Sequence, residues 1–181
     1  MDTTWNPAYK STDVTLSNGD KTASYMNEAY DSVLGTSGKS TGKHYLEMVI
    51  NSTALVVGVG NASTRLNGRS WNTANIRGAY SNRKVPTDVV YGAALAADDV
   101  VGIAVDLVNN TIGFYKNNTY LGVAYSDLGS MGTIYPYASC ASYSTYTVTL
   151  RTLQSEFSYT PPAGFTPWDG LAVNQIPQAI S

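Results

Sequence analysis

The sequence predicts an all-β protein, a sandwich of two antiparallel sheets. Three observations support this class: helical periodicity is nearly absent, short segments alternate apolar and polar residues, and Asn, Gly, Asp and Pro separate those segments. Many short period-two strands joined by such turns are typical of sandwiches and barrels. The 181 residues suffice for one domain with a real core. We expect a single domain over residues 1–168 and a C-terminal tail over residues 169–181.

The first half of the chain offers three clear strand regions. A hairpin is predicted in DVTLSNGDKTASY, with its turn at Asn18, Gly19 and Asp20. Residues 35–43 read as a flexible loop before the strands HYLEMVI and ALVVGVGNA. Residues 66–88 have no clean period and many turn formers, so we expect long loops there with at most short edge strands.

The second half is dominated by VVGIAVDLVNNTIGFYKNN, residues 100–118. Val101, Ile103 and Val105 share one face of its first strand, and Asn109-Asn110 tolerates the positive φ of a tight turn. The chain is expected to return through the following strand and to turn again at the second Asn pair. Further strands are predicted in TYLGVAY, IYPYASC and YTVTLRTL, before the proline-rich closing segment FSYTPPAGFTPW.

Composition argues against several classes of partner. The net charge is −2, only 13% of residues are charged, and Lys and Arg are scattered, so we expect no nucleic-acid partner. No stretch is long and apolar enough to cross a bilayer, and the start MDTTWNPAYK has no apolar signal core. We therefore expect no membrane insertion, no signal peptide, and synthesis in a cytoplasm.

The residues that usually carry catalysis are sparse. Cys140 is the single cysteine and His44 the single histidine, so a zinc site built from these ligands is excluded by counting. Cys140 lies on an apolar strand and is expected to be buried, whereas His44 is expected to be an exposed polar residue at the start of a strand. The glutamates are far apart in sequence and form no E-x-D-x-x-E strand. We expect no catalytic residue, no metal and no cofactor.

The order of the segments resembles the SPRY domain, the core of the B30.2 family. The matching pieces are DVTLSNGDKTA, GKHYLEMVI, VVGVGNA, DDVVGIAVDLVNNTIGFYKNNTYLGVAY, IYPYASC and FSYTPPAGF. The chain departs from the family pattern at Leu46, usually Trp, and at Asn118, often Gly. The resemblance implies a bent sandwich shaped like the concanavalin-like jelly roll of legume lectins. It also implies structural roles for Glu47 and Asp106, and non-enzymatic binding of proteins or peptides through edge loops.

The same resemblance places the binding surface on the loops of residues 61–84 and 142–146. These loops carry Trp, Tyr and Arg, the side chains that most often supply interface energy. Trp71 is equally consistent with packing in the core, the tyrosines with capping a sheet edge, and the arginines with solubility. The candidate partner-binding residues are Arg69, Trp71, Asn72, Arg77, Tyr80, Asn82, Arg83, Tyr143 and Tyr146.

We therefore expect a non-catalytic binding module. The Ser/Thr/Asn/Tyr-rich strands and the TPPAGFTPW ending resemble SPRY modules of bacteriophage virion proteins. This resemblance implies a capsid decoration, head-fibre or tail protein that binds other virion proteins and is oligomeric in the assembled particle. One alternative is a lectin-like module that binds a host-surface glycan. A second alternative is a polysaccharide hydrolase built on a lectin-like sandwich.

Overall fold

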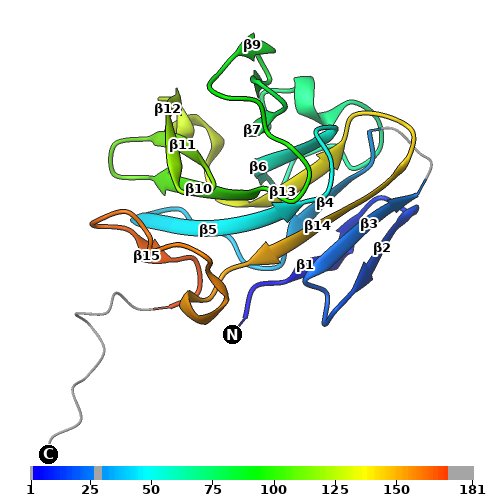
Figure 1. Ribbon diagram of the computed structural model, residues 1–181, viewed down its shortest axis with the longest axis horizontal. Coiled ribbons are helices and arrows are strands. Elements are labelled where there is room, and N and C mark those ends of the chain that lie inside the picture. Colours follow the sequence, from blue (N-terminus) through cyan, green and yellow to red (C-terminus); the bar gives the residue numbers. More distant parts are fainter. Residues whose placement is uncertain (1, 27–29, 171–181) are drawn as a thin grey trace, which may run out of the picture.

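The computed structural model describes residues 2–26 and 30–170, and these form two β-sheets packed face to face (Figure 1). The predicted fold class is confirmed. One sheet has seven strands, in the order β1 (Trp5–Lys10), β4 (Ser32–Gly35), β13 (Ile134–Cys140), β6 (Leu55–Asn61), β7 (Ile76–Tyr80), β8 (Arg83–Val85) and β9 (Val89–Val90).

The other sheet has eight strands. Its path runs β12 (Thr119–Tyr125), β11 (Thr111–Lys116), β10 (Val100–Asp106), β5 (Lys43–Ile50), β14 (Thr145–Arg151), β3 (Thr22–Met26) and β2 (Val14–Ser17), and β15 (Thr166–Pro167) pairs with β5 in parallel. Every other strand pair is antiparallel across the described residues. Within the described ranges, three short 3-10 helices interrupt the loops: η1 (Ser70–Asn72), η2 (Leu128–Met131) and η3 (Gln154–Glu156).

The main core lies between the two sheets. Alternate residues of β5, β6 and β10 point into it, as the period-two pattern predicts. The expected hairpin is confirmed, because β10 and β11 pair with Ile103 opposite Phe114 and Val105 opposite Ile112. Asn110 in its turn adopts φ 59°. Cys140 is buried in this core, also as expected.

The segment expected to form long loops contains an interior strand. β7 is paired on both sides, with β6 and β8, and four of its five residues are buried. Its sequence, IRGAY, conceals this because only Ile76 is a large aliphatic residue and Arg77 is buried. Gly58 and Gly78 lie opposite each other. A Cβ on Gly58 would lie 2.1 Å from the Arg77 carbonyl oxygen, so the close approach of β6 and β7 requires glycine there.

A second apolar cluster covers the outer face of the seven-stranded sheet. It contains Leu34, Val56, Ile76, Val85 and Tyr137, and Trp71 from the loop of residues 62–75 packs on it. This loop therefore lies against the sheet, and it gives that face a covering layer.

Two buried carboxylates hold loops in place, in the structural roles that the resemblance implies. Glu47 is fully buried and accepts hydrogen bonds from the backbone N–H groups of Ser158, at 2.8 Å, and Tyr159, at 2.9 Å. Asp106 accepts from the backbone and side chain of Asn109 and pairs with Lys43 at 2.9 Å. Burial alone would raise the pKa of Asp106, but these hydrogen bonds and the Lys43 ammonium outweigh it and lower the pKa.

His44 differs from the expected exposed polar residue, because it is half-buried. Its ring meets the edge of Trp168 at a centroid distance of 5.8 Å, and its Nε2 lies 2.8 Å from the Thr41 carbonyl oxygen. Burial lowers the pKa of His44. The closing segment causes this burial, since β15 pairs alongside His44. Asp169 accepts a hydrogen bond from the Thr3 hydroxyl at 2.6 Å, and residues 171–181 of the expected tail lie outside the described residues.

Candidate functional site

The candidate surface is built on the loop of residues 62–75, between β6 and β7 (Figure 1). Ser70 anchors this loop to the sheet beneath it. The Ser70 hydroxyl is fully buried and lies 2.6 Å from the Ser32 hydroxyl and 2.6 Å from the Tyr137 hydroxyl. These contacts hold the backbone at Ser70 in place, and so they also fix the positions of its two neighbours in the chain, Arg69 and Trp71.

Arg69 and Trp71 form an aromatic cluster with Tyr80 and Tyr30. Trp71 lies between the two tyrosines, with ring centroids 6.2 Å from Tyr30 and 6.0 Å from Tyr80. The Arg69 guanidinium lies 4.8 Å from the centre of the Tyr30 ring and donates to the Tyr30 hydroxyl at 3.0 Å. We name these four residues the aromatic cluster. They combine apolar area with a fixed cation, which suits contact with another macromolecule.

Trp71 combines both roles that the sequence left open. Its ring is half-buried against the second apolar cluster and also belongs to the aromatic cluster. Its indole Nε1 is buried and donates to no residue in the described part of the chain. This nitrogen therefore adds no hydrogen bond that would hold the Trp71 ring in place.

Tyr30 was not anticipated from the sequence. It precedes β4 and adopts φ 73°, and its backbone N–H donates to the Cys140 carbonyl at 2.8 Å. This bond places Tyr30 beside the point where the loop of residues 141–144 leaves β13. Ala141 in that loop packs on the second apolar cluster together with Trp71. The two predicted loops leave the sheet at opposite ends of β13, and the first loop crosses the outer face so that Trp71 packs on the same cluster as Ala141 of the second.

The predicted tyrosines of the second loop differ in environment. Tyr143 is the most exposed large apolar side chain among the described residues, at 72%. Tyr146 is half-buried, packs on the main core, and its hydroxyl lies 2.7 Å from the Ser142 hydroxyl. Tyr143 is therefore free to contact a partner, whereas Tyr146 supports the loop that carries Tyr143.

Arg77 is not part of the accessible surface. Its side chain is buried, with 6% of the residue exposed, and it forms two hydrogen bonds to Asp127, at 2.9 and 2.7 Å. The Arg77 guanidinium is the main cause that lowers the pKa of Asp127. This pair links β7 to the turn that follows β12, which is a structural task.

The remaining predicted residues lie near the margin of the aromatic cluster. Asn72 and Asn82 are exposed. Arg83 pairs with Asp88 at 3.5 Å, and the Tyr80 hydroxyl donates to the same carboxylate at 3.0 Å. Of the nine predicted residues, the structure thus brings Arg69, Trp71 and Tyr80 into one cluster.

Within residues 2–26 and 30–170, no group of three or more His, Cys, Asp or Glu side chains converges on a metal position. Burial raises the pKa of the Cys140 thiol, which disfavours the reactive thiolate. The described residues also contain no helix with the length and apolar character needed to span a membrane.

A two-sheet antiparallel β-sandwich that displays aromatic and Arg side chains on its loops is the architecture of a family of recognition modules. The model of one such family, the SPRY domain, matches residues 43–152. The chain belongs to the SPRY family, whose domains are generally non-catalytic modules that mediate protein–protein interaction.

Solved structures share this fold at low sequence identity. The SPRY domain of human HERC1 is 18% identical with a TM-score of 0.71, over 83% of this chain and 98% of that chain. Stonustoxin is 16% identical with a TM-score of 0.68, over 83% of this chain and 27% of that chain. The TRIM65 PSpry domain is 15% identical with a TM-score of 0.64, over 83% of this chain and 92% of that chain. No curated protein sequence matches the chain.

Proposed function

We propose that this chain is a non-catalytic binding protein that recognises a protein partner through the aromatic cluster and Tyr143. The observation that carries this proposal is that Arg69 and Trp71, on a loop anchored by the buried Ser70 hydroxyl, both contact the Tyr30 ring, which lies before β4. A rigid surface loses little conformational freedom on binding, so its aromatic and Arg contacts contribute to affinity with a small entropic cost.

We further propose that the partner is a virion protein of a bacteriophage, which this chain joins as a capsid decoration, head-fibre or tail component after synthesis in the host cytoplasm. The Ser/Thr/Asn/Tyr-rich strands and the TPPAGFTPW segment support this source. Symmetric sites on such a particle would make the bound protein oligomeric. Cross-linking mass spectrometry on assembled particles tests the proposal, because cross-links should join a virion protein to the segments that carry the aromatic cluster and Tyr143.

A pair of matched variants tests the surface itself. Arg69→Ala combined with Tyr143→Ala removes two exposed contacts while leaving both apolar clusters intact. Arg65→Ala removes an exposed arginine from the same loop and serves as the control. The double variant should lose at least tenfold in affinity for the cross-linked partner, which corresponds to about 1.4 kcal/mol. Equal affinity of the double variant and the control would move the site elsewhere.

A further inference from the structure

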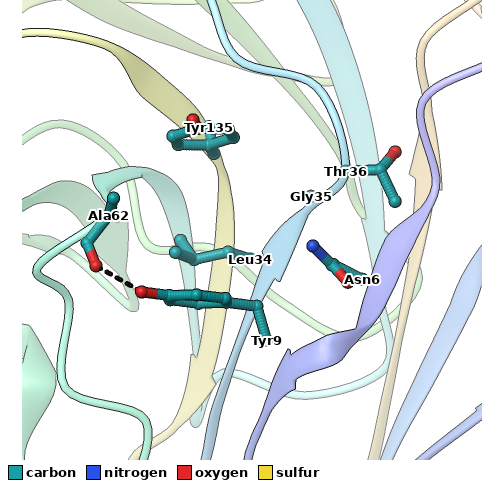
Figure 2. A pocket seen from close by; sticks show the side chains of 7 residues that line it. All are labelled: Asn6, Tyr9, Leu34, Gly35, Thr36, Ala62 and Tyr135. Atoms are coloured by element: carbon teal, nitrogen blue, oxygen red, sulfur yellow. Dashed lines mark hydrogen bonds between the residues drawn. The ribbon is translucent and has the colours of Figure 1, made fainter.

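A pocket of about 220 Å³ lies on the outer face of the seven-stranded sheet, where β1 borders β4. It adjoins Tyr135 near the start of β13, whereas the aromatic cluster adjoins the end of that strand. The two sites are therefore separate. The lining residues are Asn6, Tyr9, Leu34, Gly35, Thr36, Ala62 and Tyr135 (Figure 2).

Two tyrosine rings form the walls of this pocket. Figure 2 shows Tyr9 and Tyr135 on opposite sides, with Leu34 between them. The Tyr9 hydroxyl donates to the Ala62 carbonyl at 2.6 Å, which fixes its ring. Gly38 packs directly on the other ring, because a Cβ there would lie 2.8 Å from the Tyr135 Cε1 atom. Both walls are thus held in place before any ligand arrives.

The polar groups of the pocket are neutral, and they lie beside the rings. No Asp, Glu, Lys, Arg or His lines it. Asn6 accepts a hydrogen bond from the Ala8 backbone N–H through Oδ1 at 2.9 Å. Its Nδ2 donates to no residue within the described ranges, and Figure 2 shows this nitrogen turned toward Leu34. The Tyr135 hydroxyl likewise has no partner among the described residues and is able to donate and accept.

These features specify the shape and polarity of the ligand. It must present apolar surface to two rings and to Leu34, and hydrogen-bonding groups to the Asn6 amide. A pyranose ring has this character, since its C–H groups lie on its faces and its hydroxyls at its edge. The pocket is smaller than the cavities that enclose drug-sized ligands, which suits a single ring. We propose that this pocket binds one pyranose unit of a neutral glycan.

A peptide fits the same pocket less well. A peptide that extends the sheet would have to pair with β1, but Pro7 lacks an N–H and the β1–β4 register is irregular between Trp5 and Lys10. The ring of a bound proline is apolar at its edge as well as on its faces, and it would leave the Asn6 amide facing carbon. A charged sugar or a phosphate would meet no cation in the pocket.

Nuclear magnetic resonance on the isotopically labelled full chain tests the proposal. The probes are the methyl glycosides of glucose, galactose and mannose, added at millimolar concentration. At least one should shift the side-chain amide signals of Asn6 and the backbone signal of Ala62 in a saturable manner. Signals from Tyr143 in the other surface should stay in place. No saturable shift of the Asn6 signals with any of the three glycosides would overturn the assignment.

Two variants measure the contributions of the wall and the amide. Tyr135→Leu keeps apolar bulk but removes the flat ring, and Asn6→Ala removes the donor at a half-buried position. We expect affinity to fall about tenfold and about fivefold, respectively, as loss of an aromatic contact and of one hydrogen bond implies. The matched control, Tyr143→Ala, should bind the glycoside as the natural sequence does. If Tyr135→Leu fails to fold, Asn6→Ala still decides.

Two further probes distinguish other occupants. A hexaproline peptide and adenosine each offer flat or rigid rings but contain no pyranose ring. Tighter binding of either probe than of every glycoside, with shifts of the same Asn6 signals, would refute the glycan assignment. Because Arg69 and Tyr143 lie outside this pocket, failure here leaves the proposed protein-binding surface untouched, and the reverse also holds.

Discussion

Replacement of Ser70 tests whether buried hydroxyls hold the recognition loop rigid. Ser70→Ala deletes an oxygen that lies 2.6 Å from both the Ser32 and the Tyr137 hydroxyls. Two hydrogen bonds at about 1 kcal/mol each give an expected loss of about 2 kcal/mol in the free energy of unfolding. The loss is limited to this size because Ser139 and Ser32 also interact with the Tyr137 hydroxyl and remain available to it.

Urea unfolding measures this loss, and a second variant apportions it. Tyr137→Phe removes the opposite partner, and the Ser70→Ala/Tyr137→Phe double variant completes a cycle whose coupling should be about 1 kcal/mol. Ser63→Ala is the control, because Ser63 is exposed in the same loop and its hydroxyl forms no hydrogen bond with any described residue. It should change stability by less than about 0.5 kcal/mol.

Amide hydrogen exchange shows where the effect is felt. In Ser70→Ala, exchange should accelerate in residues 62–75 and stay unchanged in β10 and β11, which lie in the other sheet. Affinity for the protein partner should fall with the loss of loop order. A stability loss below about 0.5 kcal/mol, together with unchanged exchange in the loop, would refute the reasoning that Ser70 anchors it.

Three other replacements probe the scaffold and the cluster. Glu47→Gln should lower the free energy of unfolding in urea by about 3 kcal/mol, because the amide oxygen of Gln can accept from only one of the two backbone N–H groups that the carboxylate binds. The control, Asp13→Asn at an exposed position, should leave the free energy of unfolding almost unchanged. The pKa of Asp106 is lowered from 3.8, so its stabilising contribution is present above pH 3.8 and is lost as the pH falls below that value through the lowered pKa. Asp106→Asn should therefore flatten the decline of the urea midpoint below pH 3.8, and an unchanged decline would contradict this. Trp71→Phe should keep the free energy of unfolding within about 1 kcal/mol, because it keeps an aromatic ring and removes an unpartnered donor, whereas Trp71→Ala should lose about 2 kcal/mol. Equal losses in the two variants would contradict this expectation.

The predictable part of the fold is the part encoded locally. In β10 and β11, alternation and the Asn pair lie within one short stretch, so the hairpin and its inward face follow from neighbouring residues. The same holds for the hairpin of β2 and β3, where Asn18 and Gly19 both adopt positive φ. The structural role of Asp106 was implied by the family resemblance, and the structure shows that its contacts are local too, because the backbone N–H groups that it binds belong to Val108 and Asn109.

The less predictable part depends on contacts between distant segments. The sequence did not predict β7 as an interior strand, because its burial depends on β6, β8 and the covering loop. In addition, β7 contains the charged Arg77, which is buried because it pairs with Asp127 in a distant turn. Tyr30 and Arg69 meet only because their segments are joined by pairing across the sheet. The glycan pocket likewise draws its walls from β1 and β13. The spacing of residues in the sequence does not predict contacts between such distant segments.

The two recognition surfaces share one structural element, the loop of residues 62–75. At the pocket, the carbonyl oxygen of its first residue, Ala62, accepts a hydrogen bond from the Tyr9 hydroxyl. Further along the loop, the Ser70 hydroxyl forms a hydrogen bond with the Tyr137 hydroxyl beneath the aromatic cluster. The bonds between these two points include one from the Ser32 backbone N–H to the Leu66 carbonyl at 3.0 Å, so the loop is tied to the sheet along its length. A ligand at either surface therefore contacts a segment already ordered in the free protein. If Ser70→Ala loosened the loop as far as Ala62, glycoside affinity would fall together with partner affinity; a fall confined to the partner would show that the Leu66 bond isolates the two sites.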